Sequence, residues 1–577
     1  MIAHKHITKI IAVVMAVAVC LSLCAVVFSD QITAAAGDTG ISMEYETALF
    51  DTGSIISVNI RMDEADWNEM LANATAEEYY ECDVEVNGTT FYRVGIRPKG
   101  NTSLTSIASD PTTDRYSFKL EFDHYVDGQT CFGLDKLILN NNYADATNMK
   151  EALVYDMYQY LGADASLYNY AKISVNGEYW GVYLALEAVE DSFLLRNYGA
   201  QSGELYKPDS MNIGGGFDAD DMDFSGTDLS NMTPPDRQET GDQADTPQFP
   251  SQKPGADSES TAESPTDSDE RPEMDFNFGG MGGFSMGGGG ADLNYTDDEL
   301  DSYETIWDGE VTSTKKSDHK RVVTALKNIS EGNNLEDYMD IDNLLRYMAV
   351  HVFSVNEDSL SGNMAHNYYL YESGGRLNIL PWDYNLALGG MGSGNDATSV
   401  VNDAIDNAFS GTTFFDTLMA DETYHSQYYA YLRQLVSEYI NGGGFDAFYE
   451  RVRSQIDALV ETDPTAFYSY EEYQAAADTL YQVVKLRGES IQGQLDGTIP
   501  STAEEQRESD ALIDASSLDL SAMGSMNTGG GMPSRDSNRE EKSDGDSNNG
   551  EKPDGFLPPQ FDGERPDNLT PPQLGDH

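Results

Sequence analysis

The stretch V-N-E-D-S-L-S-G-N-M-A-H-N-Y-Y-L-Y, residues 355–371, continues through a Gly-Gly turn into L-N-I-L-P-W-D-Y-N-L-A-L-G-G, residues 377–390. This pattern predicts a polar loop and then a hairpin, with one strand from Asn367 to Tyr371 and the other from Leu377 to Leu380. Asp358 lies in the loop, and Asp383 follows the second strand just after Pro381-Trp382. We therefore expect two aspartates on one side of a hairpin.

Two aspartates placed in this way are typical of a phosphoryl-transfer site. One orients the attacking hydroxyl, and the other holds magnesium on the nucleotide together with an asparagine. We predict that Asp358 is the catalytic base and that Asp383 is a metal ligand. The alternatives are a solvated or capping loop aspartate at position 358 and a turn-forming aspartate at position 383.

Three further blocks accompany this stretch. They are V-G-I-R-P-K-G-N-T-S from Val94, Y-S-F-K-L-E-F from Tyr116, and V-N-G-E-Y-W-G-V-Y-L-A-L-E ending at Glu187. In content and order the four blocks resemble the spore-coat protein H (CotH-type) kinase family, over roughly residues 55–460 apart from one insert. The resemblance implies an atypical kinase that uses ATP and Mg²⁺.

The resemblance also implies positions for the metal ligands and the nucleotide. The H-N-Y-Y-L-Y motif points to Asn367 as a magnesium ligand, while Asn363 has the D-x-x-x-x-N spacing of protein kinases and is kept as the alternative. Lys119, on an expected strand, would reach the phosphates, with Glu151 as its ion-pair partner. A solvated edge lysine is the alternative. The remaining predicted nucleotide contacts are Arg97 and Lys99 beside a tight turn, Glu187 at a hinge, and Lys207.

The composition limits the classes of partner. The 577-residue chain has 99 Asp and Glu against 34 Lys and Arg, a formal net charge of -65. Such a charge repels nucleic acid and anionic lipid headgroups, which argues against binding to either. Without clustered cysteines and histidines the sequence offers no zinc site.

The sequence of the N-terminus predicts a targeting segment. A basic flank precedes an apolar run from Ile10 to Phe28, and Ala34–Ala36 offers a cleavage site. We expect export, either by a cleaved signal peptide or with an uncleaved membrane anchor, and therefore an extracytoplasmic location. Cys82 and Cys131, both beyond this segment, are expected either to form one disulfide or to be two buried thiols.

We expect an α+β, two-lobed, atypical kinase-like fold. Its parts are a signal peptide or anchor (1–36), a mixed β N-lobe (41–207), a disordered Gly/Met-rich acidic insert (208–294), a helical C-lobe with the catalytic loop (295–497) and a disordered acidic tail (498–577). The insert and the tail have too little apolar periodicity to bury a core.

The expected function is transfer of the γ-phosphoryl group of ATP to a hydroxyl side chain of an envelope or coat protein. The alternative is a catalytically inactive surface or coat scaffold, which the acidic, Gly-Met-rich insert favours. The two hypotheses differ in whether Asp358 takes part in phosphoryl transfer.

Overall fold

The computed structural model describes residues 40–199, 203–208, 291–362, 365–391, 396–407, 409 and 412–524. The described residues belong to one unit, Met1–Met526. The predicted targeting segment, nearly all of the predicted insert and the last 53 residues of the predicted tail lie outside them. Among the helices in the described part of the chain, none combines the length and the apolar character needed to cross a membrane.

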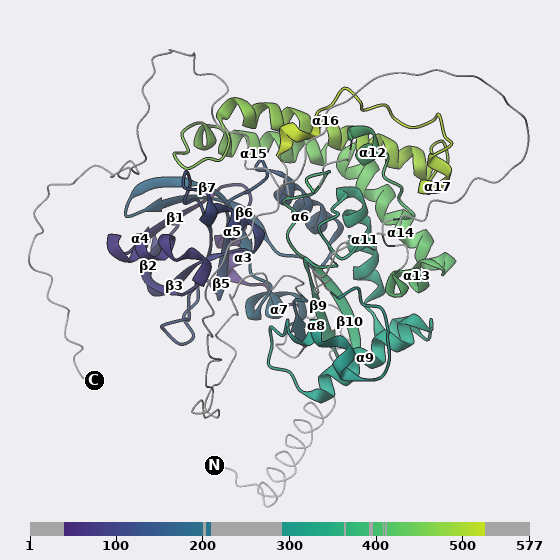
Figure 1. The fold of residues 1–577 in the computed structure, drawn as a ribbon, viewed down its shortest axis with the longest axis horizontal. Coiled ribbons are helices and arrows are strands. Elements are labelled where there is room, and N and C mark those ends of the chain that lie inside the picture. The colour runs from purple at the N-terminus through teal and green to yellow at the C-terminus, as the bar shows by residue number, and fades with distance from the viewer. Residues whose placement is uncertain are drawn as a thin grey trace, which may run out of the picture. The chain divides into compact units, whose positions relative to one another are not determined.

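The first half of the chain forms a closed barrel of seven strands in the order β1-β2-β3-β4-β5-β7-β6 (Figure 1). Neighbouring strands are antiparallel, except that β1 and β6 are parallel. The strands are β1 (Ile56–Arg61), β2 (Tyr80–Val86), β3 (Thr89–Lys99), β4 (Ser117–Glu121), β5 (Lys136–Asn140), β6 (Tyr168–Val175) and β7 (Glu178–Glu187).

Alternating side chains explain why these segments close into a barrel. Phe118 and Leu120 of β4 are fully buried with Leu137 and Leu139 of β5 in one hydrophobic core, whereas Lys119 between them points to the opposite face. Two Asn-Gly turns, at Asn87 and Asn176, join β2 to β3 and β6 to β7. Both residues of each turn have positive φ angles, as the hairpin turns of twisted strands require.

Short helices accompany the barrel: α3 (Glu44–Ala48), α4 (Glu64–Ala72), α5 (Thr102–Ser109), α6 (Lys150–Leu161) and α7 (Asp191–Tyr198). Asp63 caps α4 by accepting a hydrogen bond from the backbone N–H of Ala65. Helix α6 belongs to a second hydrophobic core, which it shares with the helices of the C-terminal half. It therefore connects the barrel to that half.

The second half is mostly helical. Its helices are α8 (Glu304–Trp307), α9 (Lys316–Ser330), α10 (Leu335–Tyr338), α11 (Ile341–Ser354), α12 (Ala397–Asn402), α13 (Thr413–Met419), α14 (Glu422–Gln434), a π-helical turn (Leu435–Ile440), α15 (Gly444–Glu461), α16 (Tyr470–Leu495) and α17 (Ala503–Gln506). In Figure 1, α11 and α14 lie beneath the long helix α16. The later part of the expected helical C-lobe is formed by long helices after residue 413, with one interruption between α13 and α14.

A small sheet lies between the helices and carries the predicted hairpin. Strands β9 (Tyr368–Ser373) and β10 (Arg376–Pro381) are antiparallel and turn at Gly374–Gly375, and β8 (Glu204–Tyr206) pairs with β9. Glycine suits this turn because both residues have positive φ angles. The hairpin prediction is thus confirmed.

The mixed α+β class is confirmed, but three details differ from expectation. The closed barrel was not foreseen, because the parallel closure of β1 on β6 leaves no local sequence pattern. Asp342 precedes the apolar residues Leu344 and Leu345 and was therefore expected to cap helix α11, but the cap is Asp340, whose carboxylate accepts from the Asn343 N–H. Cys82 and Cys131 are both buried free thiols, the second of the two expected alternatives.

The segment 498–524 is folded, although we expected the disordered tail to begin at Thr498. Ile499, Ala515 and Met523 are buried in it, and the carbonyl of Met523 accepts a hydrogen bond from the N–H of Ala146 at 3.1 Å. Isolated apolar residues without helical periodicity gave no sign of this packing in the sequence.

Candidate active site

The loop after α11 places Asp358 between two side chains. Nε2 of His366 lies 2.5 Å from Oδ1 of Asp358, and Nδ2 of Asn367 donates to Oδ2 of Asp358 at 3.1 Å and to its backbone carbonyl at 2.8 Å. The carboxylate is therefore held from both sides. A carboxylate has about four lone-pair positions, so it keeps the capacity to accept one more proton or hydrogen bond.

The backbone around the hairpin is unusual. Asn367, just before β9, has φ 57°, and Asp383, just after β10, has φ 59°. Among residues other than glycine, Asn and Asp tolerate this left-handed conformation best. Side-chain Nδ2 of Asn356 donates to the carbonyl of Asp383 at 3.2 Å and so links the Asp358 loop to the Asp383 turn.

Asp383 lies among charged groups. Burial raises the pKa of its carboxyl, and the negative charge of Asp358 raises it further, while Lys99, Lys207 and His366 oppose this shift. The two ammonium groups flank the neighbouring indole: Nζ of Lys99 is 5.6 Å and Nζ of Lys207 is 6.0 Å from the centroid of the Trp382 ring. Lys99 at the end of the barrel strand β3 and Lys207 directly after β8 thus bring two cations to Asp383.

A polar chain connects Lys99 to helix α6. Nζ of Lys99 lies 3.3 Å from Oδ1 of Asn140, and Nδ2 of Asn140 donates to Oε2 of Glu151 at 2.8 Å. Burial and the charge of Asp383 raise the pKa of Glu151 to about 8. Burial lowers the pKa of Lys99, as does Lys207, against the opposing effects of Asp383 and Glu151.

Nine of the ten predicted site residues lie in the described part of the chain. The structure brings together Asp358, Asn367, Asp383, Lys99, Lys207 and Glu151. The predicted ion pair between Lys119 and Glu151 is wrong: Nζ of Lys119 lies 3.0 Å from Oε1 of Glu190. The reason is the register of β3 and β4, which sets Lys119 opposite Arg97, two residues before Lys99.

Arg97 and Glu187 have other partners. Arg97 forms an ion pair with Glu77. Glu187 is fully buried and accepts hydrogen bonds from the hydroxyl of Tyr45 at 2.5 Å and from Nη2 of Arg196 at 2.6 Å. These contacts tie α3 and α7 to the end of β7. Asn363 lies outside the described residues.

Sequence reasoning missed three residues of the cluster. Asn140 begins the run Asn140–Asn142 at the end of β5, and that run was the available signal. His366 was read only as part of a motif, and Asn356 was not singled out. A run of polar residues directly after an apolar strand is a useful indication of a site at that strand's end.

The donor set fits magnesium in the form in which kinases use it. Among the described residues there is no group of three or more His, Cys, Asp or Glu side chains that could hold a metal ion. Mg²⁺ usually takes one or two carboxylates and completes its shell with phosphate oxygens and water. Asp383 and the amide oxygen of Asn367 are the groups that would serve as such ligands, and the buried Oε1 of Glu151 has no hydrogen-bond partner in the described part of the chain. Several carboxylates therefore lie close together, and a bound cation would reduce the electrostatic repulsion between them.

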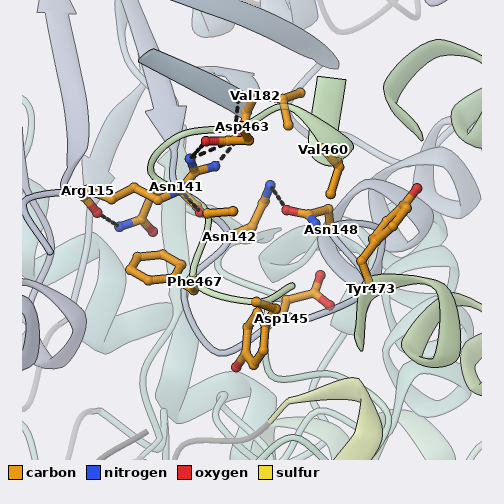
Figure 2. A pocket seen from close by; sticks show the side chains of 12 residues that line it. Arg115, Asn141, Asn142, Asp145, Asn148, Val182, Val460, Asp463, Phe467 and Tyr473 are labelled. Carbon is orange, nitrogen blue, oxygen red and sulfur yellow. Dashed lines mark hydrogen bonds and ion pairs between the residues drawn. The ribbon is translucent and has the colours of Figure 1, made fainter. Parts of the chain in front are cut away.

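A different hollow lies where the barrel meets the helical half. Figure 2 shows Arg115 reaching Asp463, with Asn142, Asp145 and Tyr473 around the cavity. Its volume is about 20 Å³, room for about one water-sized molecule, whereas ligand pockets usually measure about 300–1,000 Å³. Nη1 of Arg115 lies 2.8 Å from Oδ2 of Asp463, both almost fully buried. The ion pair therefore links the start of β4 to the end of α15. The cavity beside it is too small to hold a nucleotide.

The family model described as "CotH kinase protein" matches residues 96–260 and 284–491, more than half of the chain. The chain belongs to the CotH kinase protein family. A curated relative, "Inner spore coat protein H" of Bacillus subtilis (strain 168), is 23% identical over 378 residues, which cover 64% of this chain and 80% of the relative. The CotH match includes Lys99, Glu151, Asp358 and Asp383, so the whole polar cluster belongs to the CotH region.

Proposed function

We propose that this CotH-family chain is an atypical protein kinase, which transfers the γ-phosphoryl group of ATP to a hydroxyl side chain of an envelope or coat protein. The observation that carries the proposal is the convergence of Asp358, Asp383 and Lys99 from the loop, the hairpin and the barrel. Catalysis of phosphoryl transfer consists mostly of positioning and electrostatic stabilisation. A carboxylate for the acceptor, ligands for a metal and a cation for the phosphates are the parts it requires.

Asp358 is the group that acts on the acceptor. The acceptor oxygen forms a bond to the γ-phosphorus, the bond from that phosphorus to the β,γ-bridging oxygen breaks, and ADP leaves with the bond's electron pair. The hydroxyl proton passes to the Asp358 carboxylate and then to solvent. His366 and Asn367 hold this carboxylate in a fixed orientation, which supports its role in orienting the hydroxyl.

Lys99 is the cation that we assign to the phosphates, in place of Lys119. Lys99 lies at the end of β3, is joined through Asn140 to Glu151 and interacts with Asp383. Lys207 contributes a second positive charge beside Trp382. Asp383 and Asn367 would hold magnesium, which when bound neutralises charge on the phosphates and the leaving group.

The relative's name and the predicted export segment support the acceptor class and the location that we propose. A coat or envelope protein is the acceptor that we propose, at an extracytoplasmic site, with the N-terminal segment as signal or anchor. The test is incorporation of radiolabelled phosphate from ATP by the purified chain, with proteins exported by the same cell as acceptors, in magnesium and again in a chelator. Magnesium-dependent incorporation is expected, and its absence despite confirmed ATP binding would reject the kinase assignment.

A non-catalytic coat scaffold is the second candidate, because the relative is named only as a coat protein. It predicts that the chain binds coat proteins equally well with and without ATP and transfers no phosphate. Pull-down of exported proteins by the wild type and by a variant lacking Asp358 would then give the same set of partners.

A further inference from the structure

His351 lies inside α11, seven residues before Asp358, and is 2% exposed. It was not among the predicted site residues. Its ring stacks on Tyr347 at 5.5 Å between centroids and contacts Phe409 at 4.9 Å. The packing fixes the plane of the imidazole, and with it the directions of its two nitrogen atoms.

The two nitrogen atoms contact different loops. Nδ1 lies 3.0 Å from the hydroxyl of Tyr384, the residue after Asp383. Nε2 lies 2.7 Å from Oγ of Ser361 and 3.3 Å from Oγ of Ser359, the residue after Asp358. One ring thus joins the neighbours of both aspartates.

Further contacts hold each end of this bridge. The Tyr384 hydroxyl lies 2.6 Å from that of Tyr158 in α6, and Oγ of Ser359 donates to the carbonyl of Asn356 at 2.7 Å. Burial lowers the pKa of His351 to about 3, so near neutral pH the ring is uncharged and offers one donor and one acceptor. A neutral imidazole can therefore donate a hydrogen bond to a hydroxyl on one side of the ring and accept one from a hydroxyl on the other side.

We propose that His351 is a positioning residue, which fixes the Asp358 loop relative to the Asp383 turn so that the acceptor and the metal-bound phosphate meet in line. The inference rests on the proposed kinase function. Its physical basis is that displacement of a reacting group by about 1 Å can reduce the rate about a hundredfold. His351 is buried and its ring contacts Tyr384, Ser359 and Ser361, so its effect passes through Tyr384 and the two serines.

The experiment compares His351→Phe, which removes both contacts, with His351→Gln, which keeps polar atoms near the serines and is the milder variant if the first fails to fold. The matched control is Ser354→Ala, at the end of the same helix. It removes a buried hydroxyl that, within the described part of the chain, donates to the carbonyl of His351. Each full-length protein is assayed for magnesium-ATP affinity, the rate of phosphate transfer, melting temperature and amide exchange in the two loops.

We expect transfer to fall roughly 10- to 100-fold in both His351 variants, with ATP affinity changed less than threefold, and Ser354→Ala to retain the wild-type rate. The proposal would be overturned if the rate of phosphate transfer fell only in proportion to the amount of folded protein, or if Ser354→Ala lost as much transfer rate as the His351 variants. If the wild type itself transfers no phosphate, the kinase function fails and amide exchange decides. Faster exchange in both loops of the His351 variants supports the bridge, and faster exchange in one loop or neither overturns it.

Discussion

Nζ of Lys99 lies 3.3 Å from Oδ1 of Asn140, and through this amide the last residue of β3 is linked to Glu151 in α6. Lys119, on the neighbouring strand, instead pairs with Glu190. Two lysines of adjacent strands therefore have different surroundings, which makes them a matched pair for mutation.

The two lysines should differ in their effect on nucleotide binding. Lys99→Met removes the charge assigned to the phosphates, so we expect ATP affinity or transfer to fall roughly 10- to 100-fold, the range of a lost charge-assisted contact of about 1.5–3 kcal/mol. Lys119→Met leaves Glu190 paired with Lys136, and we expect less than a threefold change. Titration calorimetry with magnesium-ATP measures both, and a larger loss in Lys119→Met would restore Lys119 as the phosphate lysine.

Asp383→Asn should abolish the magnesium dependence of nucleotide binding, because a neutral amide replaces the anionic oxygen that magnesium prefers. The control is Asp396→Asn, which changes the same charge at the N-cap of α12, where asparagine caps equally well. Calorimetry in magnesium and in a chelator compares the two. Unchanged magnesium-ATP affinity in Asp383→Asn would make Asp383 a structural turn residue.

The stability of the nucleotide-free protein should depend on pH through Glu151. Burial and the charge of Asp383 raise the pKa of Glu151 to about 8 from 4.5. Because the folded state binds this proton more tightly than the unfolded state, the contribution is complete below the unfolded pKa and is lost as the pH rises to about 8.

Glu151→Gln cannot titrate and should lack this loss. We expect its melting temperature, relative to that of the wild type, to increase as the pH is raised from about 5 to about 8. Glu450→Gln, at an exposed position of α15, is the control and should follow the wild type throughout. Parallel curves for Glu151→Gln and the wild type would show that Glu151 does not take up this proton.

Truncation should separate the folded end of the chain from the residues beyond it. Removal of everything after Gly524 deletes only residues outside the described structure, and we expect no change in melting temperature. Removal after Gly497 also deletes the buried Ile499 and Met523, at about 1.5–3 kcal/mol for each large side chain. A loss of roughly 3–6 kcal/mol in urea unfolding is expected, and equal stability of the two truncations would show that 498–524 does not pack.

Local patterns explain which parts of the structure the sequence predicted. The Asn-Gly and Gly-Gly turns define hairpins whose chemistry is contained in a few adjacent residues, and Asp358 and Asp383 flank one of them. Their proximity followed from that hairpin. The long helices after residue 413 were also visible, because their apolar periodicity extends over many turns.

Features that depend on contacts distant in the sequence were not predictable in this way. The closure of β1 on β6 joins segments more than a hundred residues apart, and the choice of Lys99 over Lys119 depends on the register of β3 and β4, which sets Lys119 opposite Arg97. His351 resembles an ordinary core residue in the sequence, since its two hydrogen bonds arise only when the loops fold against α11. Strand order and loop packing decide these features.

The central claim is that Asp358 orients the acceptor hydroxyl, and phosphate incorporation by Asp358→Asn beside the wild type tests it most directly. The substitution keeps the size and shape of the side chain but replaces one accepting oxygen by an NH₂ donor and removes the base. We expect magnesium-ATP affinity to remain within about threefold and transfer to fall roughly 10²- to 10⁴-fold, because the lost interaction matters in the transition state. Equal incorporation by the two proteins would contradict the claim.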